Sequence, residues 1–138
     1  MEEIWKKLYE AAKAVQKEKK ISNYISAGEV AAAIESESGK IYTGVCVDTA
    51  CTLGICAERN ALFHAIAEGE SEVKAVVVVG GPKGQIKDYC VPCGTCRQAI
   101  REFCNPKECT IVMAKSADYY VVKTLDELLP NSFGREFM

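Results

Sequence analysis

Three cysteines and one glutamate in this sequence have the residue types and the spacing of a metal-dependent catalytic site. Cys93 and Cys96 form a C-x-x-C pair, and Cys56 stands two residues before Glu58 in an earlier segment. Each segment lies where a loop enters a predicted helix, so two helices packed side by side would bring the three thiols together. Three protein ligands with one open position are typical of a catalytic zinc site, whereas a structural zinc site is normally closed by four ligands.

Glu58 has the position that a proton shuttle requires. A carboxylate two residues after a metal-ligating cysteine can reach a water molecule on the metal without binding the metal itself. Cys90, Cys93 and Cys96 also resemble the beginning of a bacterial iron–sulfur motif, but that motif requires a cysteine at position 100, which is Ile100. Cys90 could instead close a structural four-cysteine zinc site, an interpretation that Glu58 at this offset disfavours.

The sequence contains eight cysteines, and no segment of it resembles a secretory signal. In a reducing cytosol, clustered cysteines are more often metal ligands or nucleophiles than disulfide partners. The isolated cysteines outside the two segments are expected to be small buried apolar residues or loop thiols. They are Cys46, Cys51, Cys104 and Cys109.

The composition predicts a single soluble domain over residues 1–138. Apolar residues make up 49% of the chain, which excludes intrinsic disorder. The 17 basic and 19 acidic residues give a net charge of −2, so no basic excess is present to bind a nucleic-acid polymer. No apolar run approaches the roughly 18 residues that cross a membrane. We therefore expect a cytoplasmic protein with no membrane partner.

The periodicity of the apolar residues predicts the elements that must position these side chains. Helical spacing predicts four helices, which cover residues 2–20, 56–68, 94–103 and 124–129. Alternating or β-branched runs predict five strands, at Glu29–Ile34, Lys40–Val47, Val73–Val79, Cys109–Ala114 and Tyr119–Lys123. The third run is almost continuously apolar, as in a strand covered on both faces. The order of elements predicts an α/β fold with a five-stranded mixed sheet and helices on both of its faces.

The two cysteine segments resemble those of the zinc-dependent cytidine deaminase family. Its signature is Cys or His, any residue and Glu, followed later by P-C-x-x-C. Residues 39–44 before the first segment, Gln98 after the second, and residues 128–130 with Phe133 near the end also resemble the family. The resemblance covers most of the chain and implies a three-layer α/β/α cytidine-deaminase-like fold.

This resemblance implies a hydrolase that binds one Zn²⁺ per chain and replaces the 4-amino group of a small aminopyrimidine by oxygen. Cys56, Cys93 and Cys96 would bind the metal. Glu58 would move protons between the attacking water and ring N3, and Arg59 would donate hydrogen bonds to the thiolates. Four further positions are implied to contact the substrate: Cys46, Asp48, Ala57 and Phe133. Members of the family form homodimers or homotetramers, so a homo-oligomer is implied as well.

The substrate-binding half of the sequence departs from the family pattern. Ala27 and Gly28 replace an Asn-Phe pair that holds the ribose, and residues 46–49 read C-V-D-T where the family has N-V-E-N. The stretch from there to Cys56 is one residue shorter than in the nucleoside deaminases. Blasticidin-S deaminase, a relative, departs from the nucleoside deaminase pattern in the same region, and its stretch there is also shorter.

Three-cysteine sites resemble those of the small free-nucleoside deaminases, whereas nucleic-acid editors resemble sites whose first ligand is His. We therefore predict a zinc-dependent deaminase of pyrimidine metabolism that acts on cytidine or deoxycytidine. One alternative is deamination of blasticidin S or another modified cytosine. Another is a zinc-binding module without catalysis.

Overall fold

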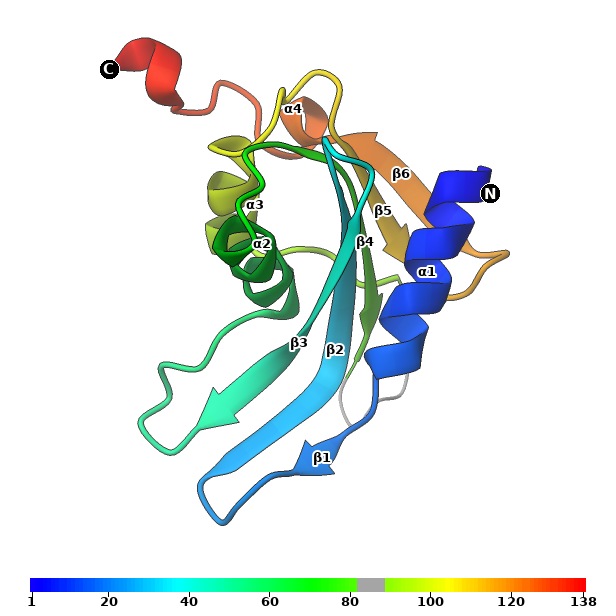
Figure 1. Cartoon of the computed structure of the whole chain (residues 1–138), viewed down its shortest axis with the longest axis vertical. Helices are drawn as coiled ribbons and strands as arrows, with labels where there is room; N and C mark the ends of the chain where they lie inside the picture. Colours follow the sequence, from blue (N-terminus) through cyan, green and yellow to red (C-terminus); the bar gives the residue numbers. More distant parts are fainter. Residues whose placement is uncertain (82–88) are drawn as a thin grey trace.

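The computed structural model describes residues 1–81 and 89–138 and contains a mixed β-sheet flanked by helices (Figure 1). The α-helices are α1 (Glu3–Val15), α2 (Ala57–Ala67), α3 (Gly94–Arg101) and α4 (Leu125–Leu128), and a 3₁₀ helix, η2, covers Arg135–Phe137. The strands are β1 (Lys19–Lys20), β2 (Ile25–Ser36), β3 (Ile41–Thr49), β4 (Val73–Gly80), β5 (Thr110–Ala114) and β6 (Tyr120–Thr124). Among the helices in this described part of the chain, none is both long enough and apolar enough to span a membrane.

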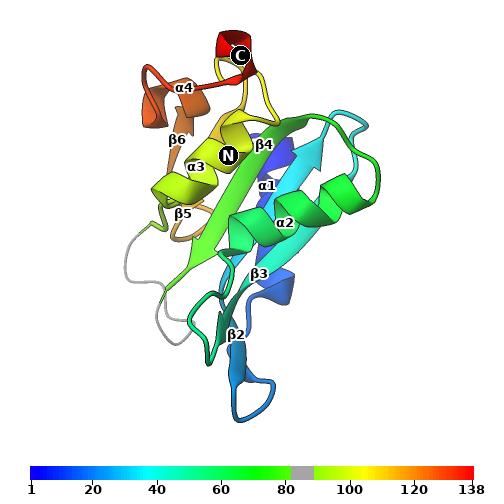
Figure 2. The same ribbon diagram turned by 90° about the vertical axis from the view of Figure 1, so that its left-hand side faces the viewer.

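The sheet lies between two layers of helices. α1 covers one face, while α2 and α3 lie side by side on the other face (Figure 1, Figure 2). β4 contacts both layers, because Val76 and Val78 belong to the core under α2 and α3, whereas Val77 and Val79 belong to the core under α1. All four valines are fully buried. The predicted three-layer arrangement, with a strand covered on both faces, is confirmed.

β2 is the strand around which this sheet assembles. β3 pairs antiparallel with one edge of β2, and β1 and β4 pair antiparallel with different parts of the other edge. β5 is parallel to β4, with α3 in the connection, and β6 is antiparallel to β5. The parallel step from β4 to β5 places the beginning of α3 beside the beginning of α2.

The sheet has six strands, so the predicted number of five is wrong. The additional strand is β1, which lies inside the segment that the periodicity predicts as the end of the first helix. α1 ends at Val15 because residues 17–20 are all charged and offer no side chain to the apolar face of the helix. Their backbone pairs with the edge of β2 instead. A short, charged edge strand also protects a sheet against pairing with other chains.

α2 crosses β3 at Gly44, and this contact requires that Gly44 has no side chain. A Cβ atom at Gly44 would lie 2.8 Å from the carbonyl oxygen of Ala57 and 2.9 Å from the Cα of Ala61. Both neighbours are backbone atoms of a helix that packs on the sheet, so neither can move away easily. The contact bears on the candidate site because Ala57 begins α2 directly after Cys56.

We expect Gly44→Ala to lower the free energy of unfolding by about 1–3 kcal/mol, because the added methyl group overpacks the contact between α2 and β3. Urea denaturation followed by circular dichroism measures the change. Gly94→Ala is the matched control, since a Cβ at Gly94 would meet nothing within 4 Å. Equal denaturation midpoints for Gly44→Ala and the wild type would show that α2 tolerates displacement from the sheet.

Candidate metal centre and active site

The beginnings of α2 and α3 bring three thiols together. Cys56 is the N-cap residue of α2, Cys93 is the N-cap residue of α3, and Cys96 lies in the first turn of α3. Their three sulfur atoms all lie within 4.8 Å of one another. The Sγ atoms of Cys56 and Cys93 are 3.7 Å apart. Two thiolates on a tetrahedral zinc ion, with Zn–S bonds of 2.3 Å, lie about 3.8 Å apart, so the donor set fits zinc.

The surroundings of the three sulfur atoms are electropositive. The N-terminus of each helix carries about half a positive charge, and the backbone N–H of Cys96 points at the Sγ of Cys93 over 3.5 Å. The guanidinium of Arg59 donates to the Sγ of Cys56 over 3.6 Å. Three thiolates and Zn²⁺ sum to −1, and these donors offset part of that charge.

Hydrogen bonding and burial shift the pKa values of the thiol groups in opposite directions. Burial alone would raise the pKa of Cys93, but hydrogen bonds from the backbone and side chain of Cys96 lower it below the ordinary value. Cys96 is buried, and burial together with the neighbouring Glu58 raises its pKa. Hydrogen bonds to Cys56 and Cys96 raise the pKa of Arg59, so the guanidinium stays charged. Cys93 is exposed and Cys56 half-buried, which leaves the cluster accessible from one side.

Glu58 lies next to this cluster, in the first turn of α2. The residue is only 4% exposed, which is rare for a glutamate with no salt bridge among the described residues. Burial raises the pKa of Glu58, and hydrogen bonds to its own backbone N–H and to Cys96 lower it in part. A carboxyl group whose pKa is moved towards neutrality can both accept and return a proton, as general acid–base catalysis requires.

Cys90 is not part of the cluster that the described residues form. Its side chain is half-buried and packs against the core under α2 and α3. Burial, and the nearby Glu58, raise the pKa of Cys90 to about 12, so its thiol stays protonated. This geometry does not support the four-cysteine alternative, because three sulfur atoms, and not four, converge among the described residues.

Two of the four predicted substrate contacts lie beside the cluster. Cys46 and Asp48, on β3, line a cavity of about 390 Å³ together with Cys56 and Arg59. The Sγ of Cys46 accepts the backbone N–H of Val30 over 3.3 Å, at a bulge where β2 loses its register with β3. The side chain of Asp48 is exposed and has no hydrogen bond or ion pair to another described residue. Cys46 is thus already engaged by the backbone, whereas the carboxylate of Asp48 is available.

The other two predicted contacts are placed differently. Ala57 is the first residue of α2 and is fully buried. Phe133 is 56% exposed, outside the cavity beside Cys56, and its ring stacks on Phe137 at a centroid distance of 6.3 Å. The backbone carbonyl of Phe133 accepts a hydrogen bond from Gln98 on α3. Within one chain, the structure therefore does not bring Phe133 to the metal ligands.

The apolar periodicity of the sequence did not predict the residues that form one wall of this cavity. The loop between β3 and α2 contributes Thr52, Leu53 and Gly54, and it is fixed by paired backbone hydrogen bonds between Val47 and Ile55. Leu53 is 85% exposed. Leu53 itself could have indicated this wall. A large apolar residue between Thr52 and Gly54 is unusual, because turns are rich in polar residues and glycine.

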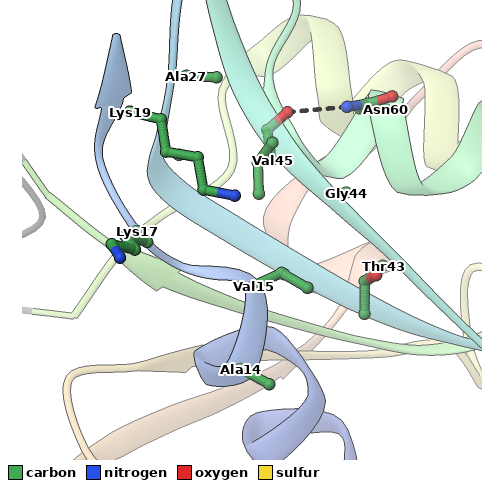
Figure 3. Close-up of a pocket in the computed structure, with 10 residues that line it drawn as sticks. Ala14, Val15, Lys17, Lys19, Ala27, Thr43, Gly44, Val45 and Asn60 are labelled. Carbon is green, nitrogen blue, oxygen red and sulfur yellow. Dashed lines mark hydrogen bonds between the residues drawn. The ribbon is translucent and has the colours of Figure 1, made fainter. Parts of the chain in front are cut away.

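A separate cavity of about 400 Å³ lies at the C-terminal end of α1 and contains none of the predicted site residues (Figure 3). Val15, Lys19 and Thr43 line it, and Asn60 of α2 donates to the backbone carbonyl of Val45 at its border. Gly28 borders it as well, and a Cβ there would lie 2.7 Å from the carbonyl carbon of Lys17. Position 28 therefore cannot carry the ring that the family pattern places there.

Known proteins resemble this chain in sequence and in fold. Residues 3–113 match the family described as "Cytidine and deoxycytidylate deaminase zinc-binding region". A cytidine deaminase of Sporosarcina psychrophila is 37% identical over 108 residues, which cover 78% of this chain and 76% of that relative. The blasticidin-S deaminase of Bacillus cereus is 27% identical over 111 residues, 77% of each chain. The crystal structure of a cytidine deaminase from Burkholderia pseudomallei superposes with a TM-score of 0.77 at 33% identity, over 96% of this chain and all of that one.

Proposed function

Since this chain belongs to the cytidine and deoxycytidylate deaminase family, it is a zinc-dependent hydrolytic deaminase, and we propose that it acts on free cytosine nucleosides. Cytidine and deoxycytidine would give uridine and deoxyuridine, with release of ammonia. The observation that carries the proposal is the placement of a buried glutamate beside three converging thiols at two helix N-termini. The test is an assay with cytidine and deoxycytidine. We expect the ultraviolet absorbance of the cytosine ring to fall, with release of one ammonia per turnover.

We propose that Cys56, Cys93 and Cys96 hold the zinc ion, as the fit of their sulfur atoms supports. When bound, the ion supplies Lewis acidity that makes a water molecule a nucleophile at neutral pH. The carboxylate of Glu58 accepts a proton from the attacking water and delivers it to ring N3 of cytosine. The same carboxylate then takes the proton of the new hydroxyl group at C4 and gives it to the amino group, so that ammonia leaves as the C4–N bond breaks and the 4-oxo group forms.

Arg59 supports the thiolates in this proposal. Its hydrogen bond to Cys56 withdraws negative charge from the sulfur. Without that hydrogen bond, the charge on the thiolate would weaken the Lewis acidity of the metal. The N–H groups at the beginnings of α2 and α3 act in the same direction. Asp48 accepts a hydrogen bond from a sugar hydroxyl at the far wall of the cavity, where its carboxylate is available.

We also propose that the enzyme is a cytoplasmic homodimer or homotetramer that does not act on nucleic-acid polymers. The net charge of −2 supports the last point, because a groove for a phosphate backbone needs a basic surface. Exposed apolar side chains at the C-terminal end support self-association, since Phe133, Phe137 and Met138 are 56%, 67% and 92% exposed. Light scattering coupled to size exclusion measures the oligomer.

A second candidate substrate class is blasticidin S or another modified cytosine. The short loop before Cys56 favours it, and so does the lack of any side chain at position 28. Both features remove contacts to a plain ribose. The reacting groups and the mechanism are unchanged, so a panel of cytosine compounds separates the two candidates.

We expect kcat/KM for cytidine to be at least tenfold below that of a family member that carries the Asn-Phe pair. Each lost hydrogen bond to a ribose hydroxyl removes about 1–3 kcal/mol of transition-state binding. Side-by-side assays of both enzymes on cytidine, deoxycytidine and blasticidin S measure the difference. Equal efficiencies on cytidine, with no better substrate in the panel, would show that other residues of this chain hold the ribose.

A further inference from the structure

The side chain of Arg97, on α3, connects the turn before Cys93 to α4. Its Nε donates to the backbone carbonyl of Pro92 over 2.8 Å, and its Nη1 donates to the carbonyl of Leu128, also over 2.8 Å. Pro92 directly precedes the N-cap residue Cys93, and Leu128 is the last residue of α4. One guanidinium therefore joins the approach to a candidate metal ligand with a helix that lies beside α3 (Figure 2).

The position of Arg97 in its helix explains this reach. Arg97 lies four residues after Cys93, about one helical turn, and its backbone N–H donates to the carbonyl of Cys93 over 2.9 Å. Side chains of a helix lean towards its N-terminus, so the guanidinium extends back to Pro92. A guanidinium presents its donors in a rigid planar fork, which allows one arginine to bind two carbonyl groups at once.

The backbone before Cys93 has few other restraints. Between residues that the structure describes, the bond from Arg97 is the one hydrogen bond that reaches residues 90–92. Proline has no N–H, so Pro92 cannot donate a backbone hydrogen bond of its own. Pro92 is also fully buried, and a buried carbonyl oxygen without a donor would destabilise the fold. Arg97 therefore positions the backbone that leads into Cys93.

Arg97 and Arg59 act on the cluster of thiols in different ways. The guanidinium of Arg59 donates to the Sγ of Cys56, whereas that of Arg97 donates to two carbonyl oxygens and, among the described residues, to no sulfur atom. A zinc site tolerates deviations of only about 0.2 Å in its metal–ligand distances. The 3.7 Å between the Sγ atoms of Cys56 and Cys93 thus depends on a fixed backbone at Cys93.

We propose that Arg97 is a positioning residue of the metal centre. By binding the carbonyls of Pro92 and Leu128, it fixes Cys93 where the three thiols meet at the separation that zinc requires. The inference rests on the proposed function, in which the three cysteines hold the ion. It also gives α4, which supplies no metal ligand, a part in metal binding. Loss of a group that orients a metal ligand typically lowers metal affinity by about 10- to 100-fold.

The test is the zinc affinity of purified variants, measured by competition with a chromophoric chelator. We expect Arg97→Gln to bind zinc about tenfold more weakly or worse, because the shorter amide cannot reach both carbonyls. Arg97→Lys keeps the charge but has one nitrogen atom where the arginine uses two, so its zinc binding should also be weaker than that of the wild type. Cobalt(II) bound to Arg97→Gln should show altered absorption bands, since these bands report how the thiolates are arranged around the ion.

Arg101→Gln is the matched control. Arg101 lies one turn later on α3, but its guanidinium binds Ser132 and Glu136 near the C-terminal end and not the turn before Cys93. This substitution also removes a hydrogen-bonded arginine from α3, so the melting temperature should fall. The zinc affinity should stay within about twofold of wild type, and the cobalt spectrum should be unchanged.

The outcomes separate this inference from the proposed function. If the wild type binds zinc and deaminates cytidine, but Arg97→Gln matches its zinc affinity and cobalt spectrum, the positioning role is wrong and the deaminase stands. The same conclusion follows if Arg101→Gln weakens zinc binding equally, since that would show a general effect of destabilisation. It follows as well if Arg97→Lys binds zinc like the wild type, because a positive charge alone would then suffice. If the wild type binds no zinc, both proposals are wrong.

Discussion

The Glu58→Gln variant is expected to keep its fold and its zinc and to lose deaminase activity by more than about 10⁴-fold. Glutamine has the size of glutamate and can still hydrogen-bond, so the packing of this 4% exposed side chain is barely disturbed. The amide cannot accept the proton of the attacking water, nor deliver a proton to ring N3. Because both steps lie on the reaction path, the loss exceeds that of a single acid–base contact. Steady-state assays, together with zinc analysis of the same sample, measure both properties.

Two results would contradict the role of Glu58. Loss of zinc from Glu58→Gln would identify the glutamate as a metal ligand and the site as structural. Retention of more than about a tenth of wild-type turnover would show that another group moves the proton. Glu70→Gln is a suitable control. Glu70 lies in the turn between α2 and β4, its carboxylate accepts hydrogen bonds from Ser38 and Tyr42, and it takes no part in the proposed reaction.

The Cys93→Ala variant is expected to fall from about one zinc ion per chain to nearly none, with loss of deamination. Its melting temperature should fall by about 10 °C relative to the zinc-loaded wild type, because metal bound only by the native state stabilises that state. Cys93 is exposed, so removing its thiol leaves no cavity in the core. Wild type and variant should therefore melt at the same temperature once a chelator has removed the zinc. Metal analysis and calorimetry, with and without chelator, give these values.

Cys51→Ala is the matched control for this experiment. Cys51 is also an exposed cysteine, but it lies outside the cluster of three thiols. Its substitution should leave the zinc content and the melting temperature unchanged. A wild-type protein that contains stoichiometric iron, or a Cys93→Ala variant that keeps its zinc, would contradict the assignment of Cys56, Cys93 and Cys96 as zinc ligands.

The elements that carry the site were predictable because their information is local. Apolar residues at helical spacing place α2 and α3, and the continuous run of valines places β4. The two cysteine segments stand at the beginnings of those helices in the sequence itself. α2 follows β3 and α3 follows β4, the two strands on either side of β2, so their N-termini meet when both helices cover the same face of the sheet.

β1 was not predictable, because an edge strand needs only a partner with free backbone groups. The charged residues that form it have no periodicity, and a helix pattern ran past their position. The pairing of Lys20 with Ser26, and of Ser26 with Asp48, depends on the register of three strands, which no local pattern encodes. The same holds for the contact between Arg101 and the C-terminal residues Ser132 and Glu136.

The sequence by itself determined the chemistry of this protein, since the types and spacing of Cys56, Glu58, Cys93 and Cys96 allow few uses other than a zinc-dependent deaminase. The tertiary structure decided the surroundings of that chemistry. It engaged the sulfur of Cys46 in a hydrogen bond from the backbone of Val30, and it left the carboxylate of Asp48 available at the wall of the cavity beside Cys56. The physical reason is that reacting groups are set by residue type and local spacing. The shape and charge of a substrate pocket arise from side chains that only strand register and packing bring together.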